Sequence, residues 1–363
     1  MGEKKSCDYG GQMMISSDVE YWIKCINLHR LLDKIAGRPI LIWGAYSKAG
    51  IICDAFENKG LEVAGYIDGH KDIFEYQKKK VYKPADVLPQ KKYYVIVAIE
   101  GVRSEIKAHL SKYDYQKDED YYYFSEHIPD IEFSSIMGEY CDAYNNRFVY
   151  EGEGKINVNI HCIGGDNTVI IGKDFDDTSM LTLLVSFGGT IKLGDGFTSQ
   201  GEVRIDAAMG GSIVVGKGLS LMKDTNINSS YNAEIEIGDY VTSGERLFLT
   251  SGRLSKVSIG NDCMFSHDVS VLGTNGHSIL DFDNKVNHSA KAEKPIEIGN
   301  HVWLGKGCTI LYGTEVGDGS IVGTKSILKG VYPHRCIAAG NIAKVVRENC
   351  TWDRRREIEF EEI

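Results

Sequence analysis

The feature that most constrains the fold of this chain is a six-residue repeat in its C-terminal part. Aliphatic residues recur at intervals of six between residues 298 and 328, and four of them are followed directly by glycine: Ile298, Leu304, Ile310, Val316, Val322 and Leu328, with Gly299, Gly305, Gly317 and Gly323. A helix requires a period of 3.6 residues and a half-buried strand a period of two, so neither explains the pattern. A period of six favours short strands joined by tight corners, with each aliphatic side chain pointing inward.

A longer form of the same repeat precedes this segment. Five aliphatic-glycine pairs are spaced 22 residues apart: Ile171-Gly172, Leu193-Gly194, Val215-Gly216, Ile237-Gly238 and Ile259-Gly260. Three six-residue units close one coil of 18 residues, so a 22-residue interval predicts a coil with one longer corner. The 39 residues from Ile259 to Ile298 predict a coil with a 21-residue excursion, over roughly residues 272–293. Of the 40 glycines in the chain, 29 lie in residues 151–363, and many of them fall at these predicted corners.

The segment 298–328 resembles the hexapeptide repeat of left-handed β-helix acyltransferases, and the resemblance extends over roughly residues 155–347. Two motifs narrow it further. Together they are similar to motifs of the xenobiotic and galactoside acetyltransferase branch. The first motif is Gly276-His277-Ser278-Ile279 with Asp281, and the second is Ile298-Gly299-Asn300 with Val302-Trp303 and Gly305. Many surface-polysaccharide O-acetyltransferases belong to this branch. The resemblance implies a left-handed parallel β-helix and an acyltransferase that uses acetyl-CoA as its donor.

The resemblance implies that His277 is the general base. A sugar hydroxyl is barely acidic, so a base must remove its proton as the new bond forms, and histidine is suited to this at neutral pH. The alternative is an exposed loop histidine without a chemical role. Asp281 could orient the imidazole, although it could equally be a solvated loop carboxylate. The resemblance also implies donors for the developing oxyanion among the corner amides near Gly305 and Lys306.

The end of the repeat resembles the closing motif of the same family, in which cations lie near the phosphates of CoA. By motif position the candidates in this chain are Lys329, Lys344 and Arg347, which could make charge-assisted contacts, and Trp303 falls near the thioester position. Alternatively, these cations only solvate the end of the repeat. The resemblance further implies a homotrimer in which CoA binds between neighbouring subunits.

The N-terminal half has a different pattern, in which short apolar strands alternate with helices. This pattern predicts a parallel α/β sheet of Rossmann type over residues 39–128. Gly44 and Gly50 are six residues apart, so the loop does not match G-x-G-x-x-G. The domain resembles the nucleotide-sugar-binding domain that precedes the β-helix in some amino-sugar acetyltransferases. That resemblance implies that Gly44 and Gly50 meet phosphates and that Asp68 meets the nucleoside; a docking or purely structural domain is the alternative.

The predicted organisation is a mixed one, an α/β domain followed by a left-handed parallel β-helix. Its parts are an N-terminal helix (1–38), the Rossmann-like domain (39–128), a linker (129–152), the β-helix acyltransferase domain (153–347) and a C-terminal tail (348–363), for which a solvated helix is expected. No apolar run approaches ~18 residues, so no membrane span is expected.

Composition excludes several other classes of function. The chain has 41 Lys and Arg against 51 Asp and Glu, a net charge of −10, and no basic block, which argues against nucleic-acid or anionic-membrane binding. Its nine cysteines include no C-x-x-C pair. They are therefore expected to be reduced thiols of a cytoplasmic protein rather than metal ligands.

These observations favour a CoA-dependent O-acetyltransferase that acts on a sugar hydroxyl in surface or capsular polysaccharide biosynthesis. Two alternatives remain open at this point. One is an N-acetyltransferase of a nucleotide-linked amino sugar, which the N-terminal domain favours, and the other is a non-catalytic β-solenoid scaffold. The expected partner is therefore a sugar or a nucleotide sugar.

Overall fold

The computed structural model describes residues 28–58, 60–70, 73–99, 102–124, 130–142, 144–176, 180–277, 279–287, 294–355 and 357–359. The chain divides into two compact units, residues 1–129 and 130–363. Most of the helix predicted over residues 1–38 lies outside the described residues, and its last part is the helix α2 (Leu28–Ile35). Within the described residues, no helix is long and apolar enough to cross a membrane.

The first unit is a small α/β domain built on a six-stranded sheet in the order β3-β4-β2-β1-β5-β6. Its elements after α2 are β1 (Ile40–Trp43), α3 (Ser47–Asn58), β2 (Val63–Ile67), β3 (Glu75–Tyr76), β4 (Lys79–Tyr82), α4 (Pro84–Val87), a 3-10 turn (Leu88–Gln90), β5 (Tyr94–Val97), α5 (Arg103–Lys112) and β6 (Tyr121–Tyr123). All neighbouring strands are parallel except the edge pair β3–β4. Strand β1 is buried on both sides, with Ile40 and Ile42 in one apolar cluster and Leu41 and Trp43 in the other, as in parallel sheets covered on both faces. The predicted α/β architecture is confirmed for this unit.

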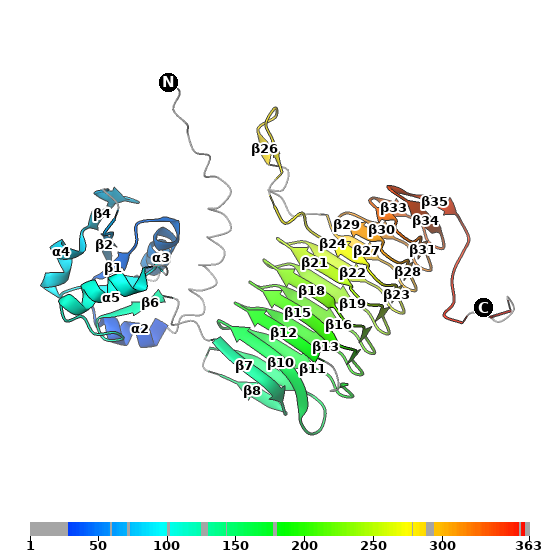
Figure 1. Ribbon diagram of the computed structural model, residues 1–363, viewed down its shortest axis with the longest axis horizontal. Helices are drawn as coiled ribbons and strands as arrows, with labels where there is room; N and C mark the ends of the chain where they lie inside the picture. Colours follow the sequence, from blue (N-terminus) through cyan, green and yellow to red (C-terminus); the bar gives the residue numbers. More distant parts are fainter. Residues whose placement is uncertain are drawn as a thin grey trace. The chain divides into compact units, whose positions relative to one another are not determined.

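The second unit is a β-solenoid with three faces, each a mainly parallel sheet, and it is left-handed as predicted (Figure 1). We number the faces in the order in which one coil visits them. Face 1 contains β8 (Glu139–Cys141), β9 (Arg147–Tyr150), β11 (Thr168–Ile171), β13 (Thr190–Leu193), β16 (Ser212–Val215), β19 (Glu234–Ile237), β22 (Lys256–Ile259), β27 (Ile296–Ile298), β30 (Glu315–Val316) and β33 (Val331–Tyr332).

Face 2 contains β14 (Thr198–Ser199), β17 (Ser220–Leu221), β20 (Thr242–Ser243), β23 (Met264–Phe265), β28 (Trp303–Leu304), β31 (Ile321–Val322), β34 (Ile337–Gly340) and β35 (Ala343–Arg347). Face 3 contains β7 (Asp130–Ile136), β10 (Ile156–Ile163), β12 (Met180–Ser186), β15 (Glu202–Ala208), β18 (Thr225–Ser230), β21 (Phe248–Gly252), β24 (Ser270–Leu272), β29 (Thr309–Leu311) and β32 (Ile327–Leu328). The corners are named by the faces that they join.

Strand register confirms the repeat that was read from the sequence. On face 1 the residues Val169, Ile191, Ile213, Ile235, Val257 and Ile296 pair in one continuous row. The 22-residue and 39-residue intervals are therefore single coils. The 18-residue interval is also a single coil, since Ile298 pairs with Val316. The aliphatic members of the repeat fill one core along the solenoid axis.

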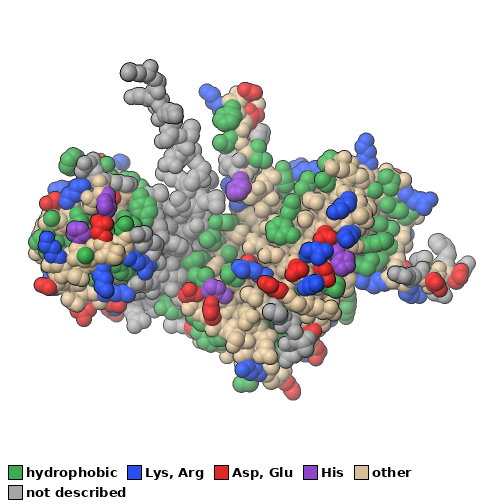
Figure 2. Space-filling model, viewed as in Figure 1, with side chains coloured by type: hydrophobic (Ala, Val, Ile, Leu, Met, Phe, Trp, Pro, Cys, Tyr) green, Lys and Arg blue, Asp and Glu red, His purple; other side chains and the backbone are tan. Residues whose placement is uncertain are grey.

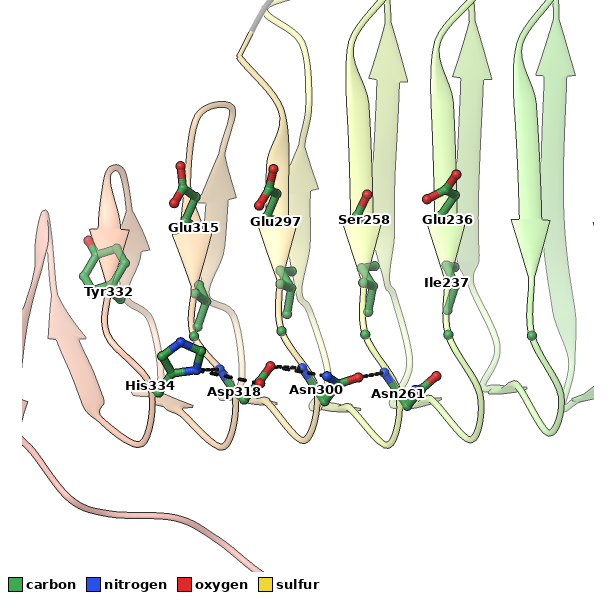
Figure 3. Close-up of a pocket in the computed structure, with 18 of the residues that line it drawn as sticks. Glu236, Ile237, Ser258, Asn261, Glu297, Asn300, Glu315, Asp318, Tyr332 and His334 are labelled. Carbon is green, nitrogen blue, oxygen red and sulfur yellow. Dashed lines mark hydrogen bonds and ion pairs between the residues drawn. The ribbon is translucent and has the colours of Figure 1, made fainter.

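Corner 1–2 shows why the repeat needs glycine. The backbone N–H of Asn261 donates to Asn300 Oδ1 at 2.8 Å, and the N–H of Asn300 donates to Asp318 Oδ1 at 2.6 Å. These side chains therefore cross from one coil to the next, as Figure 3 shows. A Cβ atom on Gly299 would lie 2.3 Å from Asp318 Oδ1, so a larger residue would block the ladder.

Two regions differ from the expectation. Residues 130–150, expected to lie in the linker, form β7, β8 and β9, which pair with the solenoid. Strand β7 pairs antiparallel with β10, and β8 pairs antiparallel with β9, so this end of two faces is closed by reversed strands. The other end is closed on face 2 by β35, which runs antiparallel to β34. In the tail, residues 348–355 form no helix and lie along corner 1–2.

Candidate functional site

His277 lies on the excursion that leaves the solenoid at corner 3–1. Strand β24 ends at Leu272 and β27 begins at Ile296, so the repeat is interrupted between them, as the sequence predicted. The excursion contains the hairpin of β25 (Leu280–Asp281) and β26 (Val286–Asn287), which projects away from the coils in Figure 1. His277 is exposed. An exposed imidazole on a projecting loop can reach a molecule that is bound beside the solenoid.

Asp281 has a structural task in the same hairpin. Its Oδ1 accepts hydrogen bonds from the backbone N–H of Asp283 (3.0 Å) and of Asn284 (2.9 Å), and its Oδ2 accepts from Asn284 Nδ2 at 2.9 Å. These bonds hold the turn between β25 and β26. None of them involves His277, so this arrangement favours the loop-carboxylate alternative over the orienting role.

Trp303 lies on face 2, in one row with Arg347, which is one of the residues predicted to contact the phosphates of CoA. The outward positions Trp303, Ile321, Ile337 and Arg347 pair across β28, β31, β34 and β35. Three strand steps separate Trp303 from Arg347, which is about 14 Å. Lys344 is on the same edge strand, β35, and is exposed. Face 2 thus offers an indole, an apolar strip and one cation in a row, with a second cation on the same edge strand, an arrangement suited to an elongated molecule with an anionic end.

The two candidate oxyanion donors at corner 2–3 differ in availability. The N–H of Gly305 donates to the carbonyl of Val322 at 2.8 Å, so it is already engaged between coils. A Cβ on Gly305 would lie 2.4 Å from that same oxygen, which explains the glycine. The N–H of Lys306 has no hydrogen bond within the described residues. Lys306 therefore remains as the candidate donor and Gly305 does not.

Lys329 lies at a different corner from the strand that carries the other two candidate cations, although Tyr332 links the two places: its hydroxyl accepts from the Lys329 N–H at 3.4 Å and donates to the carbonyl of Ala343 at 3.0 Å. Lys329 follows β32 at corner 3–1, where its ammonium lies 3.2 Å from the centre of the Tyr312 ring and donates to the Tyr312 carbonyl. Lys344 and Arg347 belong to face 2. The predicted site residues therefore fall into two groups on this chain, His277 and Lys329 at corner 3–1, and Trp303, Lys344 and Arg347 on face 2.

A groove of about 930 Å³ runs along face 1 and its corner with face 2. Figure 3 shows Glu236, Ser258, Glu297 and Glu315 in one outward row on successive strands. Lys256 neutralises part of this charge through Glu236, at 2.8 Å. Carboxylates repel phosphates, so this acidic groove does not suit CoA.

In the view of Figure 2 much of the solenoid surface is neither charged nor hydrophobic, and charged side chains of both signs gather in a compact cluster.

In the first unit, the candidate nucleotide residues make internal contacts. Asp68 follows β2, is 6% exposed, and accepts hydrogen bonds from the N–H of Ala45 (3.2 Å) and of His70 (3.0 Å). It therefore holds the loop that begins at Gly44, whose φ of +120° suits glycine. Gly50 makes room for the Gln77 side chain, since a Cβ there would lie 2.4 Å from Gln77 Nε2. These contacts favour a structural role for Gly50 and Asp68.

The contacts of the C-terminal tail with the solenoid were not predicted from the sequence. Trp352 is buried and stacks on His301 at corner 1–2, next to Trp303. Arg354 donates to Asp262 Oδ1 at 3.0 Å and to Thr242 Oγ1 at 2.9 Å, so the tail reaches back to two coils that precede the excursion. A single tryptophan beyond the last repeat was the available signal, because a lone tryptophan in a charged tail needs an apolar surface to cover it.

The fold and these motifs define a β-solenoid whose later coils carry a hexapeptide repeat. Residues 295–330 match the family described as bacterial transferase hexapeptide (six repeats). The matched segment includes Trp303, Lys306 and Lys329. The repeat identified from the sequence is therefore confirmed as a transferase hexapeptide repeat.

The chain is similar to several acetyltransferases over part of its length. A polysialic acid O-acetyltransferase of Escherichia coli O1:K1 is 34% identical over 98 residues, which cover 27% of this chain and 31% of that protein. The galactoside O-acetyltransferase of Escherichia coli K12 is 34% identical over 92 residues, or 25% of this chain and 44% of that protein. The solved structure of the polySia specific acetyltransferase NeuO is 25% identical, with a TM-score of 0.48, over 59% of this chain and 93% of that one. The chain thus spans less than half the length of these two curated relatives.

Proposed function

We propose that this chain is an acetyl-CoA-dependent O-acetyltransferase that modifies hydroxyl groups of a surface or capsular polysaccharide. The observation that carries the proposal is the single long interruption of the hexapeptide repeat, which presents His277 one coil before Trp303. The O-acetyltransferase relatives, which match 25% and 27% of the chain, support the same reaction, as does the transferase hexapeptide repeat at residues 295–330.

In the proposed reaction, His277 removes the proton of an acceptor hydroxyl as its oxygen attacks the thioester carbonyl of acetyl-CoA. The carbonyl π electrons move onto oxygen, and the N–H of Lys306, which has no partner among the described residues, stabilises this oxyanion. When the oxyanion collapses, the carbon–sulfur bond breaks and the sulfur takes the proton from His277. The products are the acetyl ester and CoA.

The division of the candidate residues into two groups supports a homotrimer. His277 and Lys329 lie at corner 3–1, whereas Trp303, Lys344 and Arg347 belong to face 2. A complete site forms if corner 3–1 of one copy meets face 2 of the next, which is the geometry of a closed cyclic assembly. In this arrangement the donor lies along the row from Trp303 to Arg347. The donor also implies a cytoplasmic enzyme, since acetyl-CoA is made inside the cell.

The first unit supports a second candidate, N-acetylation of a nucleotide-linked amino sugar. The carboxyl ends of β1, β2 and β5 meet at one sheet edge, where Rossmann-like domains bind nucleotides. We therefore interpret this unit as a Rossmann-like domain. The internal contacts of Asp68 and Gly50 favour a docking or purely structural role for it, and O-acetylation remains the main proposal.

The test is thiol release from acetyl-CoA by the full chain, measured with a panel of bacterial capsular oligosaccharides and nucleotide-linked amino sugars. We expect alkali-labile acetyl esters on an oligosaccharide, and a loss of about 10²–10⁴-fold in kcat for His277→Ala. The matched control is His334→Asn, because His334 is an exposed histidine whose role as acceptor of the Asp318 N–H an asparagine can take over.

Unchanged thiol release by His277→Ala would remove the base assignment. Alkali-stable acetyl groups on a nucleotide-linked sugar would favour the second candidate. Oligosaccharide binding without any acetyl transfer would favour a scaffold.

A further inference from the structure

Face 3 carries a strip of outward side chains in the coils that precede the excursion. We call it the face 3 strip and define it by two rows that are in register across β12, β15, β18, β21 and β24. They are Thr182, Arg204, Asn226, Phe248 and Ser270, and Leu184, Asp206, Asn228, Thr250 and Leu272. Neighbouring members of a row are about 4.8 Å apart, because they lie on adjacent strands.

The strip has no net charge. Of its ten positions only two are charged, and these pair with each other, since Arg204 Nε donates to Asp206 Oδ1 at 3.0 Å and to Oδ2 at 2.8 Å. Asn228 lies beside Asp206 in the same row. The outward row on face 1 is different, with Glu236, Glu297 and Glu315. The two surfaces therefore suit ligands of different charge, and the strip matches an uncharged polar ligand.

Several polar groups of the strip have hydrogen-bonding capacity left over. The side chains of Asn226, Thr250 and Ser270 are partly exposed and make no hydrogen bond within the described residues. Phe248 stands between Asn226 and Ser270 in its row and is 45% exposed. An exposed aromatic ring among free amides and hydroxyls combines an apolar surface for C–H groups with donors and acceptors for hydroxyls. Pyranose rings present both kinds of group.

We propose that the face 3 strip binds an extended, uncharged stretch of a polysaccharide and leads it to the site at His277. The proposal rests on the proposed function and adds to it the location and chemical class of the acceptor. Continuity supports it, because β24 carries Ser270 and Leu272 of the strip and runs directly into the excursion with His277. Neighbouring members of a row are about 4.8 Å apart, which is comparable to the length of one sugar unit. Successive coils can therefore contact successive sugars.

The test uses the full chain on an array of microbial polysaccharides and their short fragments, without acetyl-CoA. The variant is Asn226→Ala combined with Phe248→Ala. The matched control is Ser258→Ala combined with Val214→Ala, which removes one polar group and one partly exposed apolar side chain from face 1. Both pairs lie outside the core, so folding is checked by thermal denaturation of each variant.

We expect the parent chain to bind at least one polysaccharide more tightly than its short fragments, and to keep this binding at high salt, since the strip has no net charge. The strip variant is expected to weaken polymer binding about tenfold through the loss of two contacts. Its binding of short fragments and of acetyl-CoA should be unchanged, and the face 1 control should bind like the parent.

Three results would overturn the proposal: no polysaccharide bound by the parent, equal binding by parent and strip variant, or a changed oligomeric state in the strip variant, which would mark face 3 as a contact between copies. None of these bears on acetyl transfer to short acceptors, which tests the proposed function separately.

Discussion

His301 and Trp352 lie face to face, with ring centres 4.3 Å apart and ring planes 7° from parallel. They also exchange two hydrogen bonds, from Trp352 Nε1 to the His301 carbonyl at 2.7 Å and between His301 Nε2 and the Trp352 carbonyl at 2.8 Å. The other ring nitrogen of His301 contacts Asp262 at 2.6 Å. Because Trp352 also approaches Trp303, this pair joins the tail to the face on which we propose that the donor binds.

The tail should be released by acid at its Asp262 contact. Burial acts to raise the pKa of Asp262, but hydrogen bonds from His301 and Arg354 outweigh it and lower the pKa below the usual range. The ionised carboxylate therefore stabilises the closed tail above the ordinary aspartate pKa of about 3.9, and this contribution is lost as the pH falls through the lowered value. We expect a change in Trp352 fluorescence only below about pH 4.

Asp262→Asn should release the tail at neutral pH, seen as faster hydrogen exchange in residues 348–355. The control is Asp353→Asn, whose carboxylate is paired with Arg355 inside the tail itself. Equal protection in Asp262→Asn and the parent would show that the stacked rings alone hold the tail.

Two inactive variants should complement each other if the site is shared between copies. His277→Ala removes the proposed base and Trp303→Ala removes the proposed donor contact. When the two are mixed and reassembled in equal amounts, random cyclic trimers should recover about a quarter of the parental activity, because one site in each mixed trimer is intact. Activity that stays at the level of the separate variants would place both residues in one copy's site.

Removing an inward aliphatic should destabilise the solenoid more than removing an outward one. Ile310 is fully buried in the core, whereas Ile327 on the next strand of the same face points outward. We expect Ile310→Ala to lower the free energy of unfolding by about 2–5 kcal/mol, and Ile327→Ala by much less. Chemical denaturation measures both, and similar losses would contradict the inward-outward assignment.

Gly50 gives a direct test of the first unit. A methyl group at this position would displace Gln77, so Gly50→Ala is expected to cost about 1 kcal/mol of stability, and Gln77→Ala in the same chain should restore most of it. The measurement is thermal denaturation of the single and double variants. A Gly50→Ala chain with unchanged stability but weakened binding of a nucleotide sugar would instead favour the phosphate-binding role.

The sequence was sufficient to predict the coils because every coil needs the same two things. An inward aliphatic and a corner glycine must recur in each turn, so Ile259 and Ile298 could be assigned to neighbouring strands across 39 residues. The same rhythm located the excursion, and with it His277. The α/β unit was predictable for a similar reason, since strands buried on both sides are continuously apolar.

The missed parts depend on contacts between residues far apart in sequence. Strands β7 and β8 carry no corner glycine pattern, because antiparallel pairing at the end of a stack needs no coil corner. The engagement of the Gly305 amide by Val322 likewise becomes visible only when the coils are stacked. Trp352 had no predicted partner because His301 lies 51 residues earlier in the chain.

The reversed strands at the two ends of the solenoid have a consequence for its solution behaviour. A stack of parallel coils exposes free backbone groups at each end, where a second molecule could add its own coils and start a filament. Strands β7 and β8 at one end and β35 at the other oppose such templating, because they run against the direction that a new coil would need. These strands therefore prevent further coils from stacking on the ends of the solenoid. A protein cut before Ala343 should be prone to end-to-end polymerisation.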